Sequence, residues 1–232
     1  MAAPGPAGFR IDRARSGPEA GKAKGEGLVV TIEGPDGRPR CAWCAAAPEL
    51  FAYHDAEWGF PVGEDQRLFE KVCLEGFQSG LSWRTILNKR PAFRAAFAGF
   101  AIDAVAAFTE DDVARLLADA GIVRHRGKIE AAINNARRAQ ELIAEAGSLA
   151  AFFWRYEAQE AAPPQSRTTS PESVALSRAL KQRGWRFVGP TTMFALMQAM
   201  GLVNDHAEGC VSRAEAAAAR VAFAVPGGAR RS

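Results

Sequence analysis

The 232-residue chain has no run of 18 or more apolar residues, and it contains only three histidines and four cysteines. Without such a run we expect no membrane span. The N-terminus also lacks the charged-then-apolar order of a secretory signal. Cysteines without evident pairing in a chain of this size indicate a reducing compartment. These absences together predict a cytoplasmic protein that makes no contact with a membrane.

Alternating patterns typical of strands are nearly absent, and we find no internal repeat. From Cys41 onward, apolar residues recur at the 3.6-residue spacing of helices. Ser170 followed by Pro171, and Thr109 followed by three acidic residues, are typical helix starts. We expect a helix behind Glu64 and Asp65, another behind Thr109, and helices over 128–146, 170–184 and 191–202, with a loop over 157–169. The predicted class is all-α.

Residues 1–40 differ in composition from the rest, being rich in glycine, alanine, proline and charge. We interpret them as a disordered or extended N-terminal extension, followed by a domain over 41–215 and a tail over 216–232. The apolar island at residues 28–32 fits one short strand or an interaction segment, with nothing nearby that could pair with it. The net charge of +3 permits nucleic-acid binding without proving it.

Four residues that can bind a metal lie at the two ends of this domain: Cys41, His54, His206 and Cys210. On a helix, the spacing between His206 and Cys210 would point both side chains one way. Two thiolates and two imidazoles suit tetrahedral Zn²⁺, and four protein ligands leave no open position, which predicts a structural clip. Four unrelated residues are the alternative, with each cysteine a small core hydrophobe.

Cys44 adds a second ambiguity, because Cys41 and Cys44 form a C-x-x-C. This spacing could bind metal through either thiol or act as a redox pair, although no βαβ pattern surrounds it. His54 is followed by Asp55 and Ala56, so it does not begin the H-x-E of zinc deaminases, and the sequence contains no H-E-x-x-H of metalloproteases.

A short segment with two glycines, Gly184 to Gly189, separates the last two long predicted helices. It resembles the helix-hairpin-helix module of DNA repair proteins, in which glycines and helix N-terminal amides approach a phosphate. The candidate DNA contacts here are Phe187, Gly189, Thr191 and Thr192. An ordinary αα-hairpin would need glycine too. No lysine follows Gly189, so a Schiff-base mechanism has no obvious nucleophile.

Several strings, in this order, are similar to those of the DNA-3-methyladenine glycosylase I family. They cover about residues 40–210 and comprise Arg40-Cys41-Ala42-Trp43, Tyr53-His54-Asp55-Ala56-Glu57-Trp58-Gly59, Cys73-Leu74-Glu75-Gly76, Gly80-Leu81-Ser82-Trp83, Gly121-Ile122-Val123-Arg124-His125-Arg126-Gly127-Lys128 and Gly201-Leu202-Val203-Asn204-Asp205-His206.

The resemblance implies an all-helical helix-hairpin-helix glycosylase that removes 3-methyladenine from alkylated double-stranded DNA. It implies one structural zinc per chain, held by Cys41, His54, His206 and Cys210 with Cys44 as a bystander. Glu75 falls on the carboxylate that contacts the flipped base. Tyr53 and Trp83 fall on aromatic pocket positions, and Trp43 and Trp58 lie close to them in sequence. Phe77 departs from the family's string, so the sequence leaves undecided whether the edge of the pocket differs slightly from that of the family.

The implied chemistry is consistent with these residue types. Methylation at N3 makes adenine cationic, and a cation over an aromatic face gains about 0.5–2 kcal/mol. Glu75 adds charge attraction and can accept a hydrogen bond from the base. Because the cationic base is already a good leaving group, water can attack C1′ of an oxocarbenium-like sugar with little acid catalysis. A dedicated catalytic aspartate is therefore not required, and we interpret Asp205 as a structural group or as a group that orients a metal ligand.

Arg124 and His125 lie in a basic turn, which fits either contact with DNA phosphates or simple exposure, and we favour contact with DNA. On DNA the protein would be associated with the nucleoid, and we expect a monomer. Three other readings stay open: a damage binder without base release, an enzyme with a broader range of alkylated bases, and a strand-cutting lyase. The sequence leaves undecided the role of residues 1–40, the geometry of flipping and whether Asp205 acts in catalysis.

Overall fold

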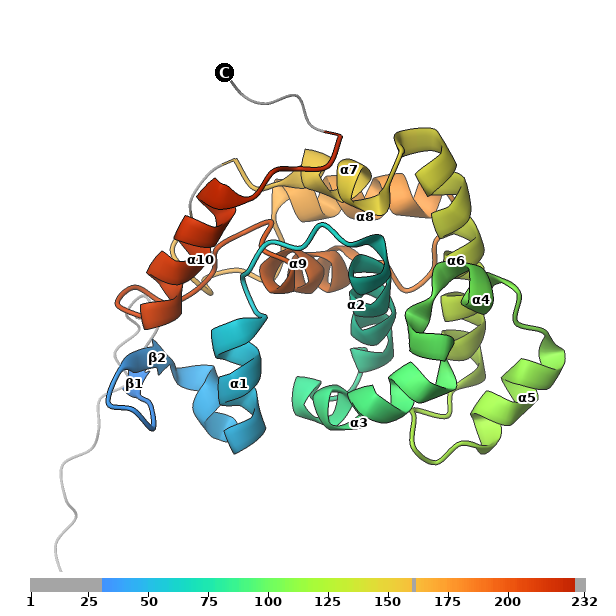
Figure 1. Cartoon of the computed structure of the whole chain (residues 1–232), viewed down its shortest axis with the longest axis horizontal. Coiled ribbons are helices and arrows are strands. Elements are labelled where there is room, and N and C mark those ends of the chain that lie inside the picture. Colours follow the sequence, from blue (N-terminus) through green and yellow to red (C-terminus); the bar gives the residue numbers. More distant parts are fainter. Residues whose placement is uncertain (1–30, 160–161, 228–232) are drawn as a thin grey trace, which may run out of the picture.

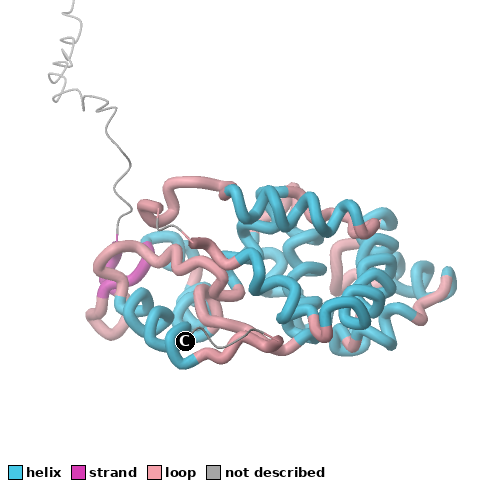
Figure 2. The backbone as a smooth tube through the Cα atoms, turned by 90° about the horizontal axis from the view of Figure 1, so that it is seen from above, coloured by secondary structure: helices cyan, strands magenta, loops and turns pink. Residues whose placement is uncertain are grey.

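The computed structural model describes residues 31–159 and 162–227, and this part of the chain is mostly helical (Figures 1 and 2). The helical class predicted from the sequence is therefore confirmed. In chain order the α-helices are α1 (Pro48–Ala56), α2 (Asp65–Gln78), α3 (Trp83–Ala96), α4 (Ile102–Ala106), α5 (Glu110–Ala118), α6 (Arg126–Ala146), α7 (Leu149–Phe153), α8 (Pro171–Gln182), α9 (Pro190–Ala199) and α10 (Val211–Ala222). Three 3₁₀ turns accompany them: η1 (Ala42–Ala46), η2 (Ala98–Phe100) and η3 (Trp154–Tyr156).

The helix starts expected from the sequence are confirmed. Thr109 and Asp112 form a reciprocal capping box at α5, and the Ser170 hydroxyl accepts from the Ser173 amide at α8. Helix α9 begins at Pro190 and ends at Ala199, three residues earlier than expected. Helix α10 crosses residue 215, the expected boundary between domain and tail, and no periodic pattern had been assigned to it.

A small β-hairpin precedes the helices. Strand β1 (Thr31–Glu33) pairs antiparallel with β2 (Pro39–Cys41), and Thr31 lies opposite Cys41. The expectation that nothing nearby could pair with the apolar island is therefore wrong at its C-terminal end. The sequence argument missed the partner because residues 39–41 carry no alternating apolar pattern. Residues 1–30, which make up most of the predicted extension, lie outside the described residues.

Helix α2 runs through the middle of the fold, and residues 68–77 along it are all buried (Figure 1). It packs against α3, α6, α7 and α9. Its buried aromatic neighbours include Phe93, Phe97 and Phe100, and the rings of Phe77 and Phe93 lie 4.7 Å apart. Because α2 is enclosed on all sides, the polar residues along it are held in fixed surroundings. None of the described helices is long and apolar enough to cross a membrane.

Segments from opposite ends of the chain meet beside α1. Strand β2 contacts α10, and both lie next to α1 at the same end of the molecule in Figure 1. The side chain of Arg38 forms a 3.1 Å ion pair with Glu215 across this contact. The two pairs of predicted metal ligands are thereby brought together despite the long stretch of sequence between them.

Candidate functional site

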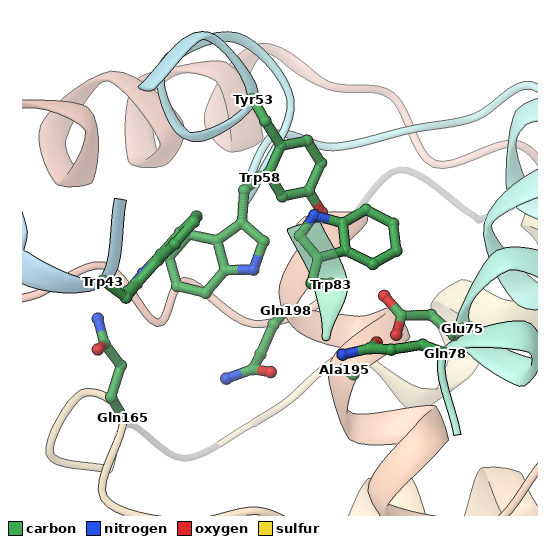
Figure 3. A pocket seen from close by; sticks show the side chains of 9 residues that line it. All are labelled: Trp43, Tyr53, Trp58, Glu75, Gln78, Trp83, Gln165, Ala195 and Gln198. Atoms are coloured by element: carbon green, nitrogen blue, oxygen red, sulfur yellow. The ribbon is translucent and has the colours of Figure 1, made fainter. Parts of the chain in front are cut away.

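A cavity of about 250 Å³ opens between α1, α2 and α9 (Figure 3). The sequence-predicted pocket residues all line it: Trp43, Tyr53, Trp58, Glu75 and Trp83. They come from separate elements, namely η1, α1, the turn after α1, α2 and the start of α3. Four further residues complete the wall and were not predicted: Gln78, Gln165, Ala195 and Gln198.

Four aromatic side chains line the cavity. The rings of Tyr53 and Trp83 lie 5.2 Å apart at 43°, and those of Trp43 and Trp58 lie 5.1 Å apart at 73°. Tyr53 and Trp58 are buried, and burial raises the pKa of the Tyr53 hydroxyl well above its usual range, with the nearby Glu75 charge adding to the effect. The Tyr53 side chain therefore remains a neutral phenol. The wall suits a flat, apolar or cationic ring.

Glu75 is buried, and its carboxylate has a cationic partner one helical turn earlier. The ammonium of Lys71 lies 3.0 Å from Oε1 of Glu75 and donates to the Tyr53 hydroxyl at 2.7 Å. It also lies 3.4 Å from the centre of the Trp83 ring. Burial lowers the pKa of Lys71, while the Glu75 carboxylate opposes that effect. Sequence reasoning missed this lysine because a lone lysine in a helix is usually solvated.

Asp205 holds the glutamines of the cavity wall. Its carboxylate accepts from the backbone N–H of Gln165 at 2.8 Å and from Nε2 of Gln198 at 2.6 Å. Among the hydrogen bonds of the described residues, none joins this carboxylate to His206. Of the two roles that we considered for Asp205, these bonds agree with the structural one, and orientation of a metal ligand is wrong. Its place next to His206 in sequence suggested a contact that the local backbone does not make.

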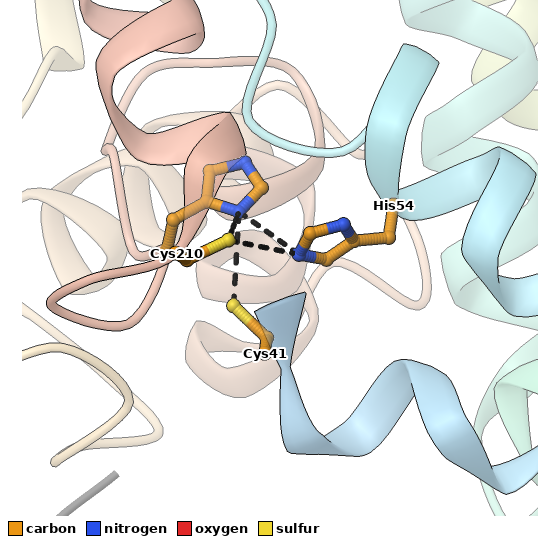
Figure 4. Close-up of side chains that lie close together, drawn as sticks. Cys41, His54 and Cys210 are labelled. Atoms are coloured by element: carbon orange, nitrogen blue, oxygen red, sulfur yellow. Dashed lines mark hydrogen bonds between the residues drawn. The ribbon is translucent and has the colours of Figure 1, made fainter. Parts of the chain in front are cut away.

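The four predicted metal ligands meet in the interior. The ligand atoms of Cys41, His54, His206 and Cys210 all lie within 4.8 Å of one another, and Figure 4 shows three of the side chains converging. Nε2 of His54 is 3.2 Å from Nδ1 of His206 and 3.5 Å from Sγ of Cys210. An ion in tetrahedral coordination, with bonds of roughly 2.0–2.3 Å, spaces its ligand atoms by roughly 3.3–3.8 Å. This donor set and its spacing fit Zn²⁺.

Both histidines have a partner on the ring nitrogen that faces away from the cluster. Nδ1 of His54 lies 2.7 Å from the Asp55 carboxylate, and Nε2 of His206 lies 2.9 Å from the Trp58 carbonyl. Such partners fix the ring orientation and leave the other nitrogen free to bind a metal. The Asp55 carboxylate also accepts from Nε of Arg40 at 2.9 Å. Asp55 thus has the orienting role that we had considered for Asp205.

The backbone conformation around the cluster explains why two positions near it are glycine. His206 and Cys210 lie in a turn before α10, not on a helix as the spacing had suggested, and Gly209 adopts a left-handed φ of 82°. At Gly59, with φ of 88°, a Cβ atom would come within 2.7 Å of the His206 ring. Both positions need glycine, one for the turn and one for the close approach.

The cluster and the cavity share a wall. Tyr53 and His54 are neighbours on α1, and the rings of Trp58 and His206 lie 4.7 Å apart. The ring of Trp43 lies 5.3 Å from that of His54. Cys44 is buried nearby, and its thiol donates to the Cys41 carbonyl at 3.0 Å instead of joining the four ligand atoms. Any group that ties the four ligands together would also position the aromatic wall.

The predicted phosphate-binding segment lies close to the C-terminal half of α2. Phe187 is exposed and has a left-handed φ of 55°, and its Cβ would be 3.3 Å from a Cβ added at Gly76. Asn135 on α6 binds both backbone groups of Arg186 at 2.8 and 2.9 Å. The segment is therefore held firmly between α2 and α6.

The first turn of α9 follows this segment. Gly189 is the residue before the helix, Thr191 is exposed and Thr192 half-buried. The first amides of a helix have no partner within it and can donate to an anion. Arg124 and His125 are also exposed, just before α6, where Nδ1 of His125 accepts from the Lys128 amide at 3.3 Å.

Lys128 ties the start of α6 to the end of α2. Its ammonium donates to the carbonyls of Phe77 and Ser79 at 2.9 and 2.6 Å. Its neighbour Gly76 and the exposed Phe187 border the same small cavity as Lys128 itself. The candidate DNA contacts before α6 and before α9 are thus connected through the end of the helix that carries Glu75.

Comparison with known proteins identifies close relatives. Residues 43–213 match the family model described as methyladenine glycosylase. The chain is 48% identical to DNA-3-methyladenine glycosylase 1 of Escherichia coli K12, over 74% of this chain and 95% of the relative. It is 41% identical to a DNA-3-methyladenine glycosylase of Haemophilus influenzae, over 74% and 96% of the two chains.

A solved structure shares the fold as well. It is 3-methyladenine DNA glycosylase I of Staphylococcus aureus, a structure concerned with 3-methyladenine recognition. It superposes with a TM-score of 0.71 at 35% identity, and the match covers 75% of this chain and 96% of the other.

Proposed function

The chain belongs to the methyladenine glycosylase family, as a DNA-3-methyladenine glycosylase I, and on that basis we propose a specific reaction for it. It flips 3-methyladenine out of alkylated double-stranded DNA and hydrolyses the N-glycosidic bond as a monomeric, monofunctional glycosylase of base excision repair. The observation that carries this proposal is the cavity in which Glu75 meets four aromatic side chains. A base inside a duplex is out of reach, so it must be rotated out at a cost of roughly a few kcal/mol.

The cavity supports recognition of a cationic base. A methyl group on N3 gives the adenine of the nucleotide a positive charge, which normal adenine lacks. The faces of Tyr53 and Trp83 attract that charge, and the Glu75 carboxylate can accept a hydrogen bond from the exocyclic amine. Discrimination then comes from differential binding of the damaged base.

The bond breaks with its electrons moving to the base. The electron pair of the C1′–N bond passes to the methylated adenine, which leaves as a neutral molecule, and the sugar becomes an oxocarbenium-like cation. Water attacks C1′ and loses a proton to solvent. No protonation of the leaving base is needed, so the reaction requires no catalytic aspartate. This agrees with the carboxylate of Asp205 being bonded to Gln165 and Gln198.

The proposal includes two contacts with DNA. We assign residues 171–199, comprising α8, the segment with Phe187, and α9, to a helix-hairpin-helix module in which the amides of Thr191 and Thr192 bind a phosphate. Arg124 and His125, which are exposed before α6, contact a neighbouring part of the backbone.

The buried cysteine and histidine cluster fits one structural Zn²⁺. Cys41, His54, His206 and Cys210 would hold it, with four protein ligands and therefore no open position for substrate. Bound zinc would supply cross-linking of the two ends of the domain and not reaction chemistry. The chain's own part is the orientation of His54 by Asp55 and of His206 by the Trp58 carbonyl.

The first test is release of 3-methyladenine from methylated duplex DNA by the full-length, zinc-loaded protein. We expect the free base to appear, identified by chromatography against a standard, with no release of normal adenine from untreated duplex. The rival class is a protein that binds damage without cutting the bond. Tight binding of methylated DNA without any released base, by a protein with a normal melting curve, would favour that rival.

We also expect no lyase activity. Within the described residues the segment that starts α9 offers Pro190, Thr191 and Thr192 in place of a lysine. The amine nearest the cavity, Lys71, does not line it and is held by Glu75 and Tyr53. Borohydride added during turnover should therefore trap no covalent protein–DNA adduct, whereas a bifunctional glycosylase run in parallel should give one. A trapped adduct would show that the protein has a Schiff-base nucleophile.

A further inference from the structure

The cavity has a positively charged group built into its wall. Lys71 is as buried as Glu75, yet it does not line the cavity; it contacts three residues that do. Its ammonium meets the Glu75 carboxylate, the Tyr53 hydroxyl and the face of Trp83 at 3.0, 2.7 and 3.4 Å. These three are the groups assigned above to recognition of a cationic base. The protein therefore places its own cation among the groups that would attract the substrate's charge.

The contacts are those of a protonated lysine. An ammonium has three N–H donors and no lone pair. One points to a carboxylate, one to a hydroxyl oxygen, and the third lies over an aromatic face, which attracts positive charge. The next nearest cation, Arg90, is paired separately with Glu57 and Glu70 at 2.6 and 2.7 Å. Glu75 and Lys71 thus form their own neutral pair beside the cavity.

The Lys71 cation affects the bound substrate and the transition state differently. In the bound substrate the positive charge is on the base, close to Lys71. As the C1′–N bond breaks, that charge moves to the sugar and the base becomes neutral. Repulsion between Lys71 and the base is therefore relieved along the reaction, and an interaction that is less unfavourable in the transition state increases the rate. An unpaired Glu75 carboxylate would do the opposite, because it would hold the charge on the base.

We propose that Lys71 is a positioning residue that sets the balance between binding and bond cleavage: by neutralising Glu75 it weakens the hold on the cationic base and favours the departure of the neutral one. This inference rests on the proposed function, since it assumes release of a cationic alkylated base. Lys71 also fixes the geometry of Glu75, because its ammonium holds Oε1 of that carboxylate. The Tyr53 hydroxyl, which accepts from Lys71, keeps its own proton free to donate.

The test is single-turnover kinetics on methylated duplex DNA, with enzyme in excess, so that half-saturation and the maximal rate are separated from product release. For Lys71→Met we expect tighter half-saturation and a slower maximal rate, each by on the order of tenfold. Lys71→Arg keeps a cation and should restore both values toward those of the wild type. A merely structural role would instead worsen both values together.

Two further variants keep the test decisive. Lys71→Gln is also neutral but retains an N–H donor for Tyr53, and it takes the place of Lys71→Met if the latter does not give a normal melting curve. Lys89→Met removes a lysine that binds the Ala120 and Gly121 carbonyls at 3.0 and 3.1 Å, away from the cavity, and should change neither value.

The results separate the inference from the function on which it rests. Absence of base release by the wild type would reject the proposed function itself. Normal release by the wild type, together with a folded neutral variant whose half-saturation and rate are both unchanged or both worse, would reject the role of Lys71 alone.

Discussion

Replacement of Glu75 by alanine is expected to abolish or strongly reduce release of 3-methyladenine, and replacement by glutamine to slow it by about 10- to 150-fold. The slowing expected for Glu75→Gln corresponds to the loss of a charge-assisted hydrogen bond of roughly 1.5–3 kcal/mol. Glu75 is buried in the cavity wall among aromatic rings, where water cannot substitute for the lost carboxylate. Single-turnover release from methylated duplex DNA, with enzyme below half-saturation so that the rate includes binding of the cationic base, measures the effect.

Either substitution of Glu75 leaves Lys71 buried without its carboxylate partner. Loss of one partner of a buried ion pair costs about 3–5 kcal/mol of stability. Unfolding by urea must therefore be measured alongside activity. A double variant, Lys71→Met with Glu75→Gln, removes both charges and should recover much of the stability while remaining slow. Glu64→Gln, which changes an exposed glutamate just before the same helix, serves as the matched control. Unchanged release by a folded Glu75→Ala protein would remove Glu75 from the mechanism.

The fold was predictable where local chemistry decides it. Ser170 and Thr109 carry the caps of α8 and α5 in their own side chains, so the sequence specifies both starts. Strand β1 was harder, because its partner, residues 39–41, carries no alternating apolar pattern, although the pairing is local and the Gly34 amide donates to the Arg38 carbonyl at 2.9 Å in the connecting turn. Helix α10 was missed because its sequence is rich in alanine and has few large apolar residues to indicate a buried face.

The candidate site, like the fold, was predictable from the sequence only in part. The family strings placed Glu75 and the four aromatic residues, and all five line one cavity. Lys71 could not be found from the pattern, because its position on α2 is recognisable as buried only when α3 and α9 enclose that helix. For Asp205, by contrast, the sequence suggested a contact that the structure does not contain. Adjacency in sequence suggested a contact with His206, while the turn directs the carboxylate toward Gln165 and Gln198.

Loss of the proposed zinc ligand in Cys210→Ser is expected to lower zinc content well below one per chain and to destabilise the fold. Structural zinc contributes roughly 10–16 kcal/mol in small finger peptides, but the large helical core here should limit the loss to several kcal/mol. At about 2–4 °C per kcal/mol for a chain of this size, the melting temperature should fall on the order of 10 °C. Elemental analysis and thermal unfolding measure the two effects.

Cys44→Ser is the matched control, since its thiol is equally buried but donates to the Cys41 carbonyl. It should retain one zinc, and full occupancy in Cys210→Ser with loss in Cys44→Ser would reassign the ligand. A closed four-ligand site also predicts that exchange of zinc for cadmium leaves the release rate unchanged. Chelation, by contrast, should slow release indirectly, because His54 and His206 pack against Trp43 and Trp58. A rate that follows the identity of the metal would instead place the ion in the chemistry and reject the structural clip.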